Sequence, residues 1–368
     1  MTIRKIELYA YSIDIEPFAI ATGTMYFAQN MLVKIHTGEG LIGWGECSAF
    51  PMIAGETQAS CLAVGKEMAA LWIGKNALQI PERIQELHQF IARNYTAKSA
   101  FDMALYDVVS QHAHLPLYKF LNPQATLKPI ETDLTIGIAT VEQMAQKAVQ
   151  FVQNGVTKIK VKVGKNAQHD VAAIAAIRKA IGYETRLQID ANQGWNFETA
   201  QATLQALEDY DIWFCEQPMP VHQNQYLPAL QQSTSIPIML DESVFTDTDL
   251  NLLLPPKGFS MVNIKFAKCG GFHNAVSIAA LAAEHRLPCM MGGMLESRLA
   301  MTAFAHFAQS QANVIIYDMD TALLGHLQDP VLGGATYQGY HIQMPEGVGL
   351  GATVDAEFLN NCTCLTIA

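Results

Sequence analysis

Short apolar segments recur at a near-constant interval beyond about residue 130, and this spacing constrains the fold more than any other feature. Stretches with helical periodicity separate these segments. Lys162 is the last charged residue of the second segment, Asp190 follows 28 residues later, and Glu216, Asp241 and Lys265 come 26, 25 and 24 residues further on in turn. An interval of about 25 residues suits one strand and one helix, and eight such units close a (β/α)8 barrel. The eight predicted strands are Thr132–Gly137, Lys158–Val163, Leu187–Asp190, Trp213–Glu216, Ile238–Asp241, Met261–Lys265, Pro288–Met291 and Val314–Tyr317.

The first 125 residues follow a different pattern, which predicts an α+β capping domain. Residues 31–36 and 41–46 are predicted strands of one hairpin, and residues 57–120 show helical spacing. Residues 321–368 are rich in glycine, and we expect them to be irregular and to fold back on the first domain. We therefore predict an α/β protein with a (β/α)8-type barrel over residues 126–320, capped by residues 1–125 and the C-terminal tail.

The composition limits the classes of partner. Half of the 368 residues are hydrophobic, and the formal net charge of -11 argues against nucleic acid or an anionic membrane as a partner. The seven cysteines include no pair with zinc-type spacing, which favours reduced thiols. We see no signal peptide and no apolar run of about 18 residues, so we expect a cytoplasmic protein that binds a small molecule. A homo-oligomer is compatible with these features.

Charged residues stand at the predicted carboxyl ends of five successive barrel strands. In such a barrel these ends face the active site. Any one of the charges could be a solvated residue at the start of a loop. Five at matched positions favour a functional cluster, because buried charges are costly unless they are paired or bound to metal. They are Lys160 with Lys162 on the second strand, then Asp190, Glu216, Asp241 and Lys265.

Three of these residues, Asp190, Glu216 and Asp241, offer carboxylate oxygens from adjacent strands. Octahedral Mg²⁺ prefers such hard ligands together with water and substrate oxygens, so we predict one Mg²⁺ per subunit. These strand ends carry no His or Cys, which makes zinc a poorer fit. A structural cluster of salt bridges with the lysines is the alternative.

The lysines suggest proton transfer. Lys160 and Lys162 lie on one side of their strand, and Lys265 comes from the far side of the three acidic strands. A lysine acts as a base only if its pKa falls, which a divalent cation and neighbouring lysines bring about by repelling the ammonium form. Two lysines across a metal-bound carboxylate would act as acid and base on opposite faces of one carbon.

Five motifs in this order carry a family resemblance: Lys160-Val161-Lys162, Asp190-Ala191-Asn192-Gln193-Gly194-Trp195, Glu216-Gln217-Pro218, Asp241-Glu242-Ser243 and Asn263-Ile264-Lys265. Together they resemble the muconate-lactonizing group of the enolase superfamily over nearly the whole chain. The resemblance implies that the three acidic residues bind Mg²⁺, that Lys162 and Lys265 are the opposed acid and base, and that Lys160 supports them.

A further motif, Tyr317-Asp318-Met319-Asp320, follows the last predicted strand. Alone, two aspartates at this spacing suit a loop turn or a helix cap. The motif resembles the DxD signature of dipeptide epimerases, which implies that Asp318 and Asp320 hold a substrate ammonium group through charge-assisted hydrogen bonds. The same resemblance implies that Thr135 and Met294 orient the substrate, although an ordinary strand role for Thr135 fits equally well.

Two predicted capping loops bear on the choice of substrate. Neither residues 17–27, with Gly23, nor residues 50–55, with Ile53, contain a cation, and we expect Gly23 and Ile53 to contact substrate. Epimerases that prefer an acidic second residue carry an arginine in the first loop, and a buried acidic side chain would lack a partner here. The resemblance therefore implies a small uncharged dipeptide such as Ala–Ala, with the proton leaving the α-carbon of the second residue.

Other functions remain compatible with the same residues. o-Succinylbenzoate synthase, N-succinylamino-acid racemase and muconate cycloisomerase share this site, but their substrates lack the free ammonium that the aspartate pair would bind. A barrel that only binds metal and ligand would not need both Lys162 and Lys265. A Schiff-base aldolase would use a lysine but leaves three carboxylates unexplained.

Overall fold

The computed structural model describes residues 1–368, and it contains the barrel that the spacing predicts. Eight parallel strands lie side by side in chain order. Apolar residues on one face of the strands join the main hydrophobic core, and those on the other face form a separate cluster of Phe214, Met239, Met261, Met290 and Ile316. The barrel is nearly closed, since the backbone N–H of Asp133 donates to the carbonyl of Tyr317 at 3.1 Å across the remaining seam. The strands are β5 (Leu134–Ile136), β6 (Lys158–Lys162), β7 (Arg186–Asp190), β8 (Ile212–Glu216), β9 (Ile238–Leu240), β10 (Met261–Ile264), β11 (Cys289–Gly292) and β12 (Val314–Asp318).

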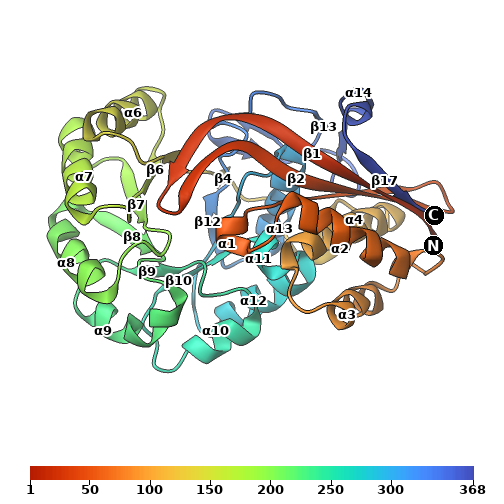
Figure 1. Ribbon diagram of the computed structural model, residues 1–368, viewed down its shortest axis with the longest axis horizontal. Coiled ribbons are helices and arrows are strands. Elements are labelled where there is room, and N and C mark those ends of the chain that lie inside the picture. The colour runs from red at the N-terminus through yellow and green to blue at the C-terminus, as the bar shows by residue number, and fades with distance from the viewer.

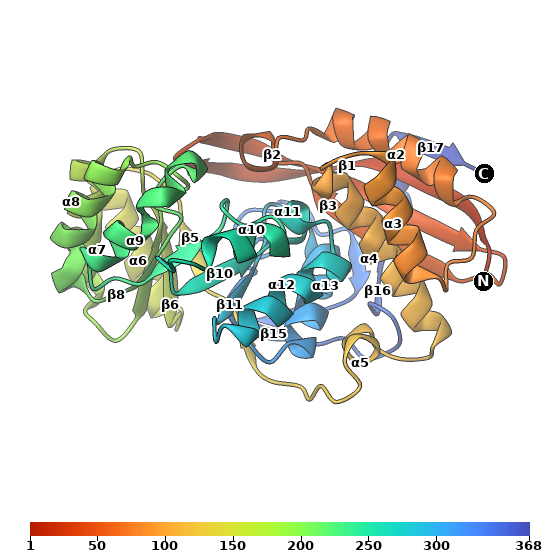
Figure 2. The ribbon, with the colours of Figure 1, turned by 90° about the horizontal axis from the view of Figure 1, so that it is seen from below.

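Helices between these strands cover the outside of the barrel (Figures 1 and 2). Several begin at a side chain that accepts a hydrogen bond from the first turn, as Thr140, Asn166, Asn196 and Thr246 do. These caps fix where each loop ends. The helices are α6 (Val141–Gln153), α7 (Ala167–Ile181), α8 (Phe197–Leu207), α9 (Leu227–Gln232), α10 (Asp247–Leu253), α11 (Phe266–Cys269), α12 (Phe272–Glu284) and α13 (Arg298–Ser310), with 3-10 turns at Glu208–Tyr210 and Val221–Tyr226.

The N-terminal region forms an antiparallel sheet with helices packed on one face. The sheet order is β17-β1-β2-β3, with β1 at Ile3–Ile20, β2 at Gly23–Thr37, β3 at Ile42–Ser48 and β17 at Cys364–Ile367. Gly43 and Gly45 let the backbone of β3 approach the helix at Tyr95–His112, because a Cβ at either position would lie about 2 Å from a carbonyl oxygen of that helix. The helices are α1 (Pro51–Ala54), α2 (Gln58–Trp72), α3 (Ile80–Phe90), α4 (Tyr95–His112) and α5 (Leu117–Leu121).

The segment predicted as the first capping loop is instead the tip of the long β1–β2 hairpin. It extends from the capping sheet over the barrel (Figure 2). Backbone bonds hold it there: Ile138 N–H donates to Ala19 at 3.0 Å, and Glu16 N–H donates to Gly325 at 2.8 Å. The strands continue through residues 17–27 because the barrel supplies these tertiary contacts, which local sequence does not reveal.

The C-terminal segment also has more regular structure than we predicted. It contains β13 (Val331–Gly333), β14 (Thr336–Gln338), β15 (His341–Gln343), β16 (Ala352–Val354) and α14 (Ala356–Asn360), and β15 pairs with β4 (Ile130–Glu131). Its last strand pairs with β1, so the two chain ends lie close together at the end of the cap away from the hairpin tip (Figure 1). No helix has the length and apolar character needed to cross a membrane, and all seven cysteines are free thiols.

Candidate active site

The charged residues predicted to form the site meet at the carboxyl ends of the barrel strands. Lys162, Asp190 and Glu216 are the last residues of β6, β7 and β8, and they pair in register across the three strands. Asp241 and Lys265 stand one residue beyond β9 and β10. Each of the five is at most 8% exposed, so the barrel buries a dense group of opposite charges.

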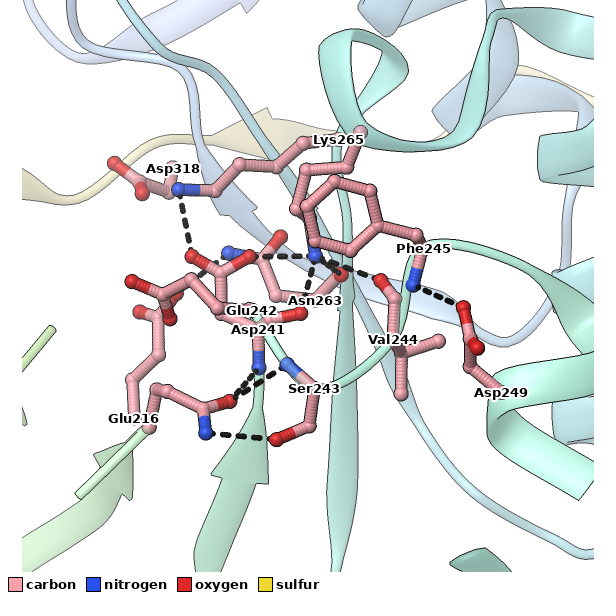
Figure 3. A network of polar contacts seen from close by, with 12 residues as sticks. Glu216, Asp241, Glu242, Ser243, Val244, Phe245, Asp249, Asn263, Lys265 and Asp318 are labelled. Atoms are coloured by element: carbon pink, nitrogen blue, oxygen red, sulfur yellow. Dashed lines mark hydrogen bonds and ion pairs between the residues drawn. The ribbon is translucent and has the colours of Figure 1, made fainter. Parts of the chain in front are cut away.

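Two lysines hold Asp241 from opposite oxygens, and Figure 3 labels one of them, Lys265. Lys265 Nζ lies 3.0 Å from Oδ2, and Lys268 Nζ lies 2.6 Å from Oδ1. Lys268 also donates to the backbone carbonyls of Asp241, Val244 and Asn263 at 2.5 to 3.0 Å. Lys268 is therefore a fixed structural cation, whereas Lys265 has a single carboxylate partner.

Lys160 is the central cation of the cluster and is fully buried. Its Nζ lies 2.6 Å from Glu216, 2.8 Å from Asp318 and 3.1 Å from Asp190. Lys162 contacts only Asp190, at 2.6 Å. Lys160 thus links the predicted metal ligands to the predicted ammonium site, and this position suits the supporting role expected for it.

The electrostatics of the cluster favour the ionised forms of Asp190 and Asp241 and the protonated form of Lys265. Burial opposes ionisation, but the neighbouring lysines outweigh it and hold the pKa values of Asp190 and Asp241 well below their usual range. Burial and the Asp190 charge raise the pKa of Glu216 to about 7. Burial opposes the charge on Lys265, yet Asp241 and Glu216 raise its pKa above the ordinary value. The protein's own charges therefore shift Lys265 opposite to the direction a base needs, and an added divalent cation would reverse that shift.

The three predicted metal ligands form a donor set that suits a hard cation. All are carboxylates on neighbouring strands, and second residues orient them: Asn263 Nδ2 donates to Glu216 at 2.7 Å, and Gln217 accepts from the N–H of Asp241 at 3.0 Å. Their side chains are turned toward lysines. A compact cluster of three carboxyl groups lies outside this set of predicted ligands: oxygens of Asp133, Asp318 and Asp320 are all within 4.8 Å of one another.

A cavity opens beside Lys162 between the barrel and the hairpin tip. Four of the predicted substrate contacts, Thr135, Met294, Asp318 and Asp320, line it together with Lys162. The hairpin contributes Ile15, Glu16 and Phe18.

The other two predicted contacts lie elsewhere. Gly23 packs against Met52, since a Cβ there would come 2.6 Å from the Met52 sulfur. Ile53 borders a different hollow, next to Gln193 and Glu242. The structure therefore brings four of the six predicted substrate residues together, and Gly23 and Ile53 stay predictions.

Several site residues were absent from our sequence-based predictions. Lys268 lies three residues after Lys265 on α11, and only its burial against carbonyl oxygens distinguishes it from a surface lysine. Asp133 is a carboxylate just before β5, and the signal that could have identified it is a charge within a predicted barrel strand. Glu46 of β3 accepts from Ser297 N–H at 2.8 Å and from its hydroxyl at 2.6 Å, and so ties the cap to the loop of Met294.

The family of the chain follows from comparison with known proteins. Residues 4–122 match the mandelate racemase / muconate lactonizing enzyme N-terminal domain, and residues 143–358 match the enolase C-terminal domain-like family. The chain belongs to the mandelate racemase / muconate lactonizing enzyme family of the enolase superfamily, as its motifs predicted. Its relatives are epimerases and racemases, and the protein is accordingly an isomerase.

Within that family, the chain is similar to three characterised relatives in sequence and to one solved structure in fold. The chain is 42% identical to a D-Ala-D/L-Ala epimerase of Cytophaga hutchinsonii, covering 98% of both chains. A dipeptide epimerase structure from that organism, with Mg and D-Ala-L-Val, has a TM-score of 0.98 and 42% identity over 100% of both chains. The hydrophobic dipeptide epimerase of Enterococcus faecalis is 36% identical over 95% of this chain and 99% of its own. An N-succinyl-L-Arg/Lys racemase of Bacillus cereus is 30% identical over 99% and 98%.

Proposed function

We propose that this protein epimerises a small uncharged dipeptide at the α-carbon of its second residue. One observation carries the proposal: Asp318 and Asp320 line the same cavity as Lys162 and lie close to the predicted metal ligands. Asp318 and Asp320 suit a substrate ammonium, and a metal held by the neighbouring carboxylates would take the substrate carboxylate. Asp318, Asp320, Lys162 and Lys265 are the residues on which the reaction would depend.

The metal we propose is Mg²⁺, held by Asp190, Glu216 and Asp241. The donor chemistry fits it, and the Cytophaga relative was solved with Mg. When bound, it would stabilise the negative charge that develops on the substrate carboxylate. Removing it with EDTA should abolish turnover, and Mg²⁺ or Mn²⁺ should restore it; full activity in metal-free protein would refute this assignment.

The two lysines divide the proton chemistry between them. Lys162 ends β6 and Lys265 follows β10, and four strand positions separate them in an eight-stranded barrel. They therefore face each other across the strands that carry the three carboxylates. In one direction Lys162 takes the α-proton while Lys265 delivers a proton to the opposite face, and in the other direction the roles exchange. Lys160, held by three carboxylates, keeps the charges around them in place.

The cavity favours a short neutral side chain on the second residue. Lys162 is its only lining Lys or Arg, and the hairpin adds Glu16. Burial lowers the pKa of the lining His326, which favours its neutral form, so an acidic side chain would meet no free cation. The names of the Cytophaga and Enterococcus relatives point to Ala–Ala and to hydrophobic dipeptides. Together these observations support Ala–Ala as the simplest substrate.

The deciding experiment compares kcat/KM for Ala–Ala, Ala–Glu and N-succinyl-Ala in the Mg-loaded protein. We expect Ala–Ala to lead, Ala–Glu to follow and N-succinyl-Ala to be poor, because the last lacks an ammonium for Asp318 and Asp320. The Bacillus cereus relative makes N-succinyl racemisation the second candidate. A clear preference for the succinylated compound would replace the dipeptide assignment with that one. Exchange of α-protons in D₂O across a dipeptide library would then identify other substrates.

A further inference from the structure

A third carboxyl group lies behind the two aspartates of the proposed ammonium site. Asp133 is 1% exposed and does not line the cavity. Gln188 Nε2 donates to its Oδ2, and its Oδ1 has no hydrogen-bond partner. A fully buried carboxyl with one unpartnered oxygen is costly, particularly when ionised. Its position directly behind the Asp318 and Asp320 side chains therefore needs a reason.

The three carboxyl groups cannot separate, because the backbone that carries them is fixed. Thr135 N–H donates to Asp320 Oδ2 at 2.8 Å, and Met319 N–H donates to the Thr132 hydroxyl, also at 2.8 Å. Tyr337 donates its hydroxyl to the carbonyl of Met319 at 2.8 Å. These bonds fasten the segment after β12 onto β5, so the carboxyl oxygens stay within 4.8 Å of one another.

Negative charge exceeds positive charge around the three carboxyl groups of Asp133, Asp318 and Asp320. Among the groups that face it, Lys160 alone makes an ion pair, with Asp318, and Lys160 is shared with Asp190 and Glu216. Lys162 and Lys265 act on Asp318 from further away, Glu216 adds negative charge near Asp133, and the partly buried Tyr337, whose pKa is raised by burial, stays neutral. One shared cation cannot offset three buried carboxylates, so at least one carboxyl in the free protein keeps its proton.

The direction of the pKa shifts agrees with this count. Burial opposes ionisation of Asp318, but Lys160 outweighs it and lowers the pKa of that group. Burial and the neighbouring aspartates raise the pKa of Asp133 well above its usual range, and burial with Asp318 raises that of Asp320 to about 7. The retained proton therefore belongs to the Asp133–Asp320 pair.

We propose that Asp133 is a positioning residue of the ammonium site: with Asp320 it retains one proton, which leaves for solvent when a substrate ammonium binds. The net charge of the pocket is unchanged by binding, because one positive charge enters as –NH₃⁺ and one leaves as H⁺. Asp133 thereby makes the site selective for a cation, since a substrate without an ammonium cannot displace the proton. This inference rests on the proposed function, which places the substrate ammonium at Asp318 and Asp320.

Calorimetry can test the proton count directly. The probe is L-Ala–aminoisobutyrate, a dipeptide whose second α-carbon bears no proton, so that it binds to Mg-loaded protein without reacting. Titrations in two buffers of different ionisation enthalpy give the number of protons released. With a carboxyl pKa of about 7, we expect release of roughly 0.9 proton near pH 6 and about half a proton near pH 7, a range in which the probe's own amine stays largely protonated. The Kd should rise about tenfold for each pH unit below 7.

Variants then assign the proton to Asp133. Asp133→Asn should lower the number of protons released near pH 6 and weaken the pH dependence of the Kd, because one of the three crowded carboxyl groups no longer titrates. Gln188→Met removes a hydrogen-bond donor that favours the ionised form of Asp133, so proton release should move to higher pH. This second variant tests the role of Asp133 even if Asp133→Asn does not fold. The matched control is Asp102→Asn, a buried carboxyl that caps α12 away from the cavity, and it should release protons like the parent.

The possible outcomes distinguish a failure of the proposed role of Asp133 from a failure of the proposed dipeptide epimerisation. If the probe does not bind the parent protein at all, the proposed function fails. If it binds without releasing a proton, or if Asp133→Asn releases as many protons as the parent, the role of Asp133 is refuted and the dipeptide assignment stands.

Discussion

Replacing one of the two opposed lysines should stop epimerisation and leave half of the proton chemistry intact. In Lys162→Ala, Lys265 can still remove the α-proton of the diastereomer whose proton faces it, and the reverse holds for Lys265→Ala. Each variant should therefore exchange the α-proton of one diastereomer of Ala–Ala with solvent. Neither should convert that diastereomer into the other.

The structure sets the size of the effect. Loss of a positioned acid or base typically costs about 10²–10⁴ in rate, or roughly 3–5 kcal/mol of transition-state stabilisation. Removing one side of a buried ion pair can also unfold a protein. Here each carboxylate keeps a second lysine, since Lys160 lies 3.1 Å from Asp190 and Lys268 lies 2.6 Å from Asp241. We therefore expect both variants to fold.

Proton NMR in D₂O separates the two reactions. L-Ala–L-Ala and L-Ala–D-Ala are each incubated with the parent and with both variants, and loss of the α-proton signal is followed beside the appearance of the other diastereomer. Circular dichroism and a Mg²⁺ titration confirm that each variant is folded and loaded. Epimerisation by Lys265→Ala within about tenfold of the parent would refute a mechanism with one lysine on each face.

Three further predictions concern the cap and the hairpin. Burial opposes ionisation of Glu7, but Lys5 and His36 hold its pKa at about 2, so its pairing stabilises the fold above pH 4.5 and is lost as pH falls toward 2. Glu7→Gln should therefore lower the free energy of unfolding by about 1–2 kcal/mol at neutral pH and by almost nothing near pH 2, in urea titrations. Glu16→Gln should raise kcat/KM for Ala–Glu relative to Ala–Ala about two- to fivefold, and an unchanged ratio would mean that Glu16 does not face the side chain. Glu46→Gln should lower the free energy of unfolding by about 1–3 kcal/mol, because the Glu46 side chain faces only hydrogen-bond donors and the new amide would place a donor against them. It should also raise KM more than Ser297→Ala does. Equal effects of the two substitutions on KM would show that Glu46 does not hold the loop that carries Met294.

The chemistry at the strand ends could be predicted from sequence because a barrel repeats. Each βα unit returns the chain to the same edge, so residues 24 to 28 positions apart, such as Lys162, Asp190 and Glu216, necessarily meet. The pairing of β6, β7 and β8 in register at these residues is the structural form of that repeat. The orientation of the carboxylates was less predictable, because it depends on which lysine each one meets.

The parts that sequence did not reveal depend on contacts between residues far apart in the chain. Nothing local in residues 17–27 shows that Ala19 will accept a hydrogen bond from Ile138, so this segment was predicted as a loop. Asp133 escaped notice for a related reason. Its chemistry comes from Asp320, almost two hundred residues away along the chain, and no pattern within its own strand indicates that neighbour.

The barrel carries the residues of the proposed reaction, whereas the hairpin lines the cavity, and this separation suggests how such a site can change its substrate. The lysines and carboxylates of the proposed reaction stand at the ends of barrel strands or within two residues of them, where the backbone ladders fix them. The hairpin tip is held over the cavity by main-chain bonds at Glu16 and Ala19, and these bonds do not depend on side-chain identity. Side chains such as Ile15 and Phe18 therefore face the cavity from a backbone that tolerates their replacement. Substitutions there should alter which second residue fits while the exchange of the α-proton continues.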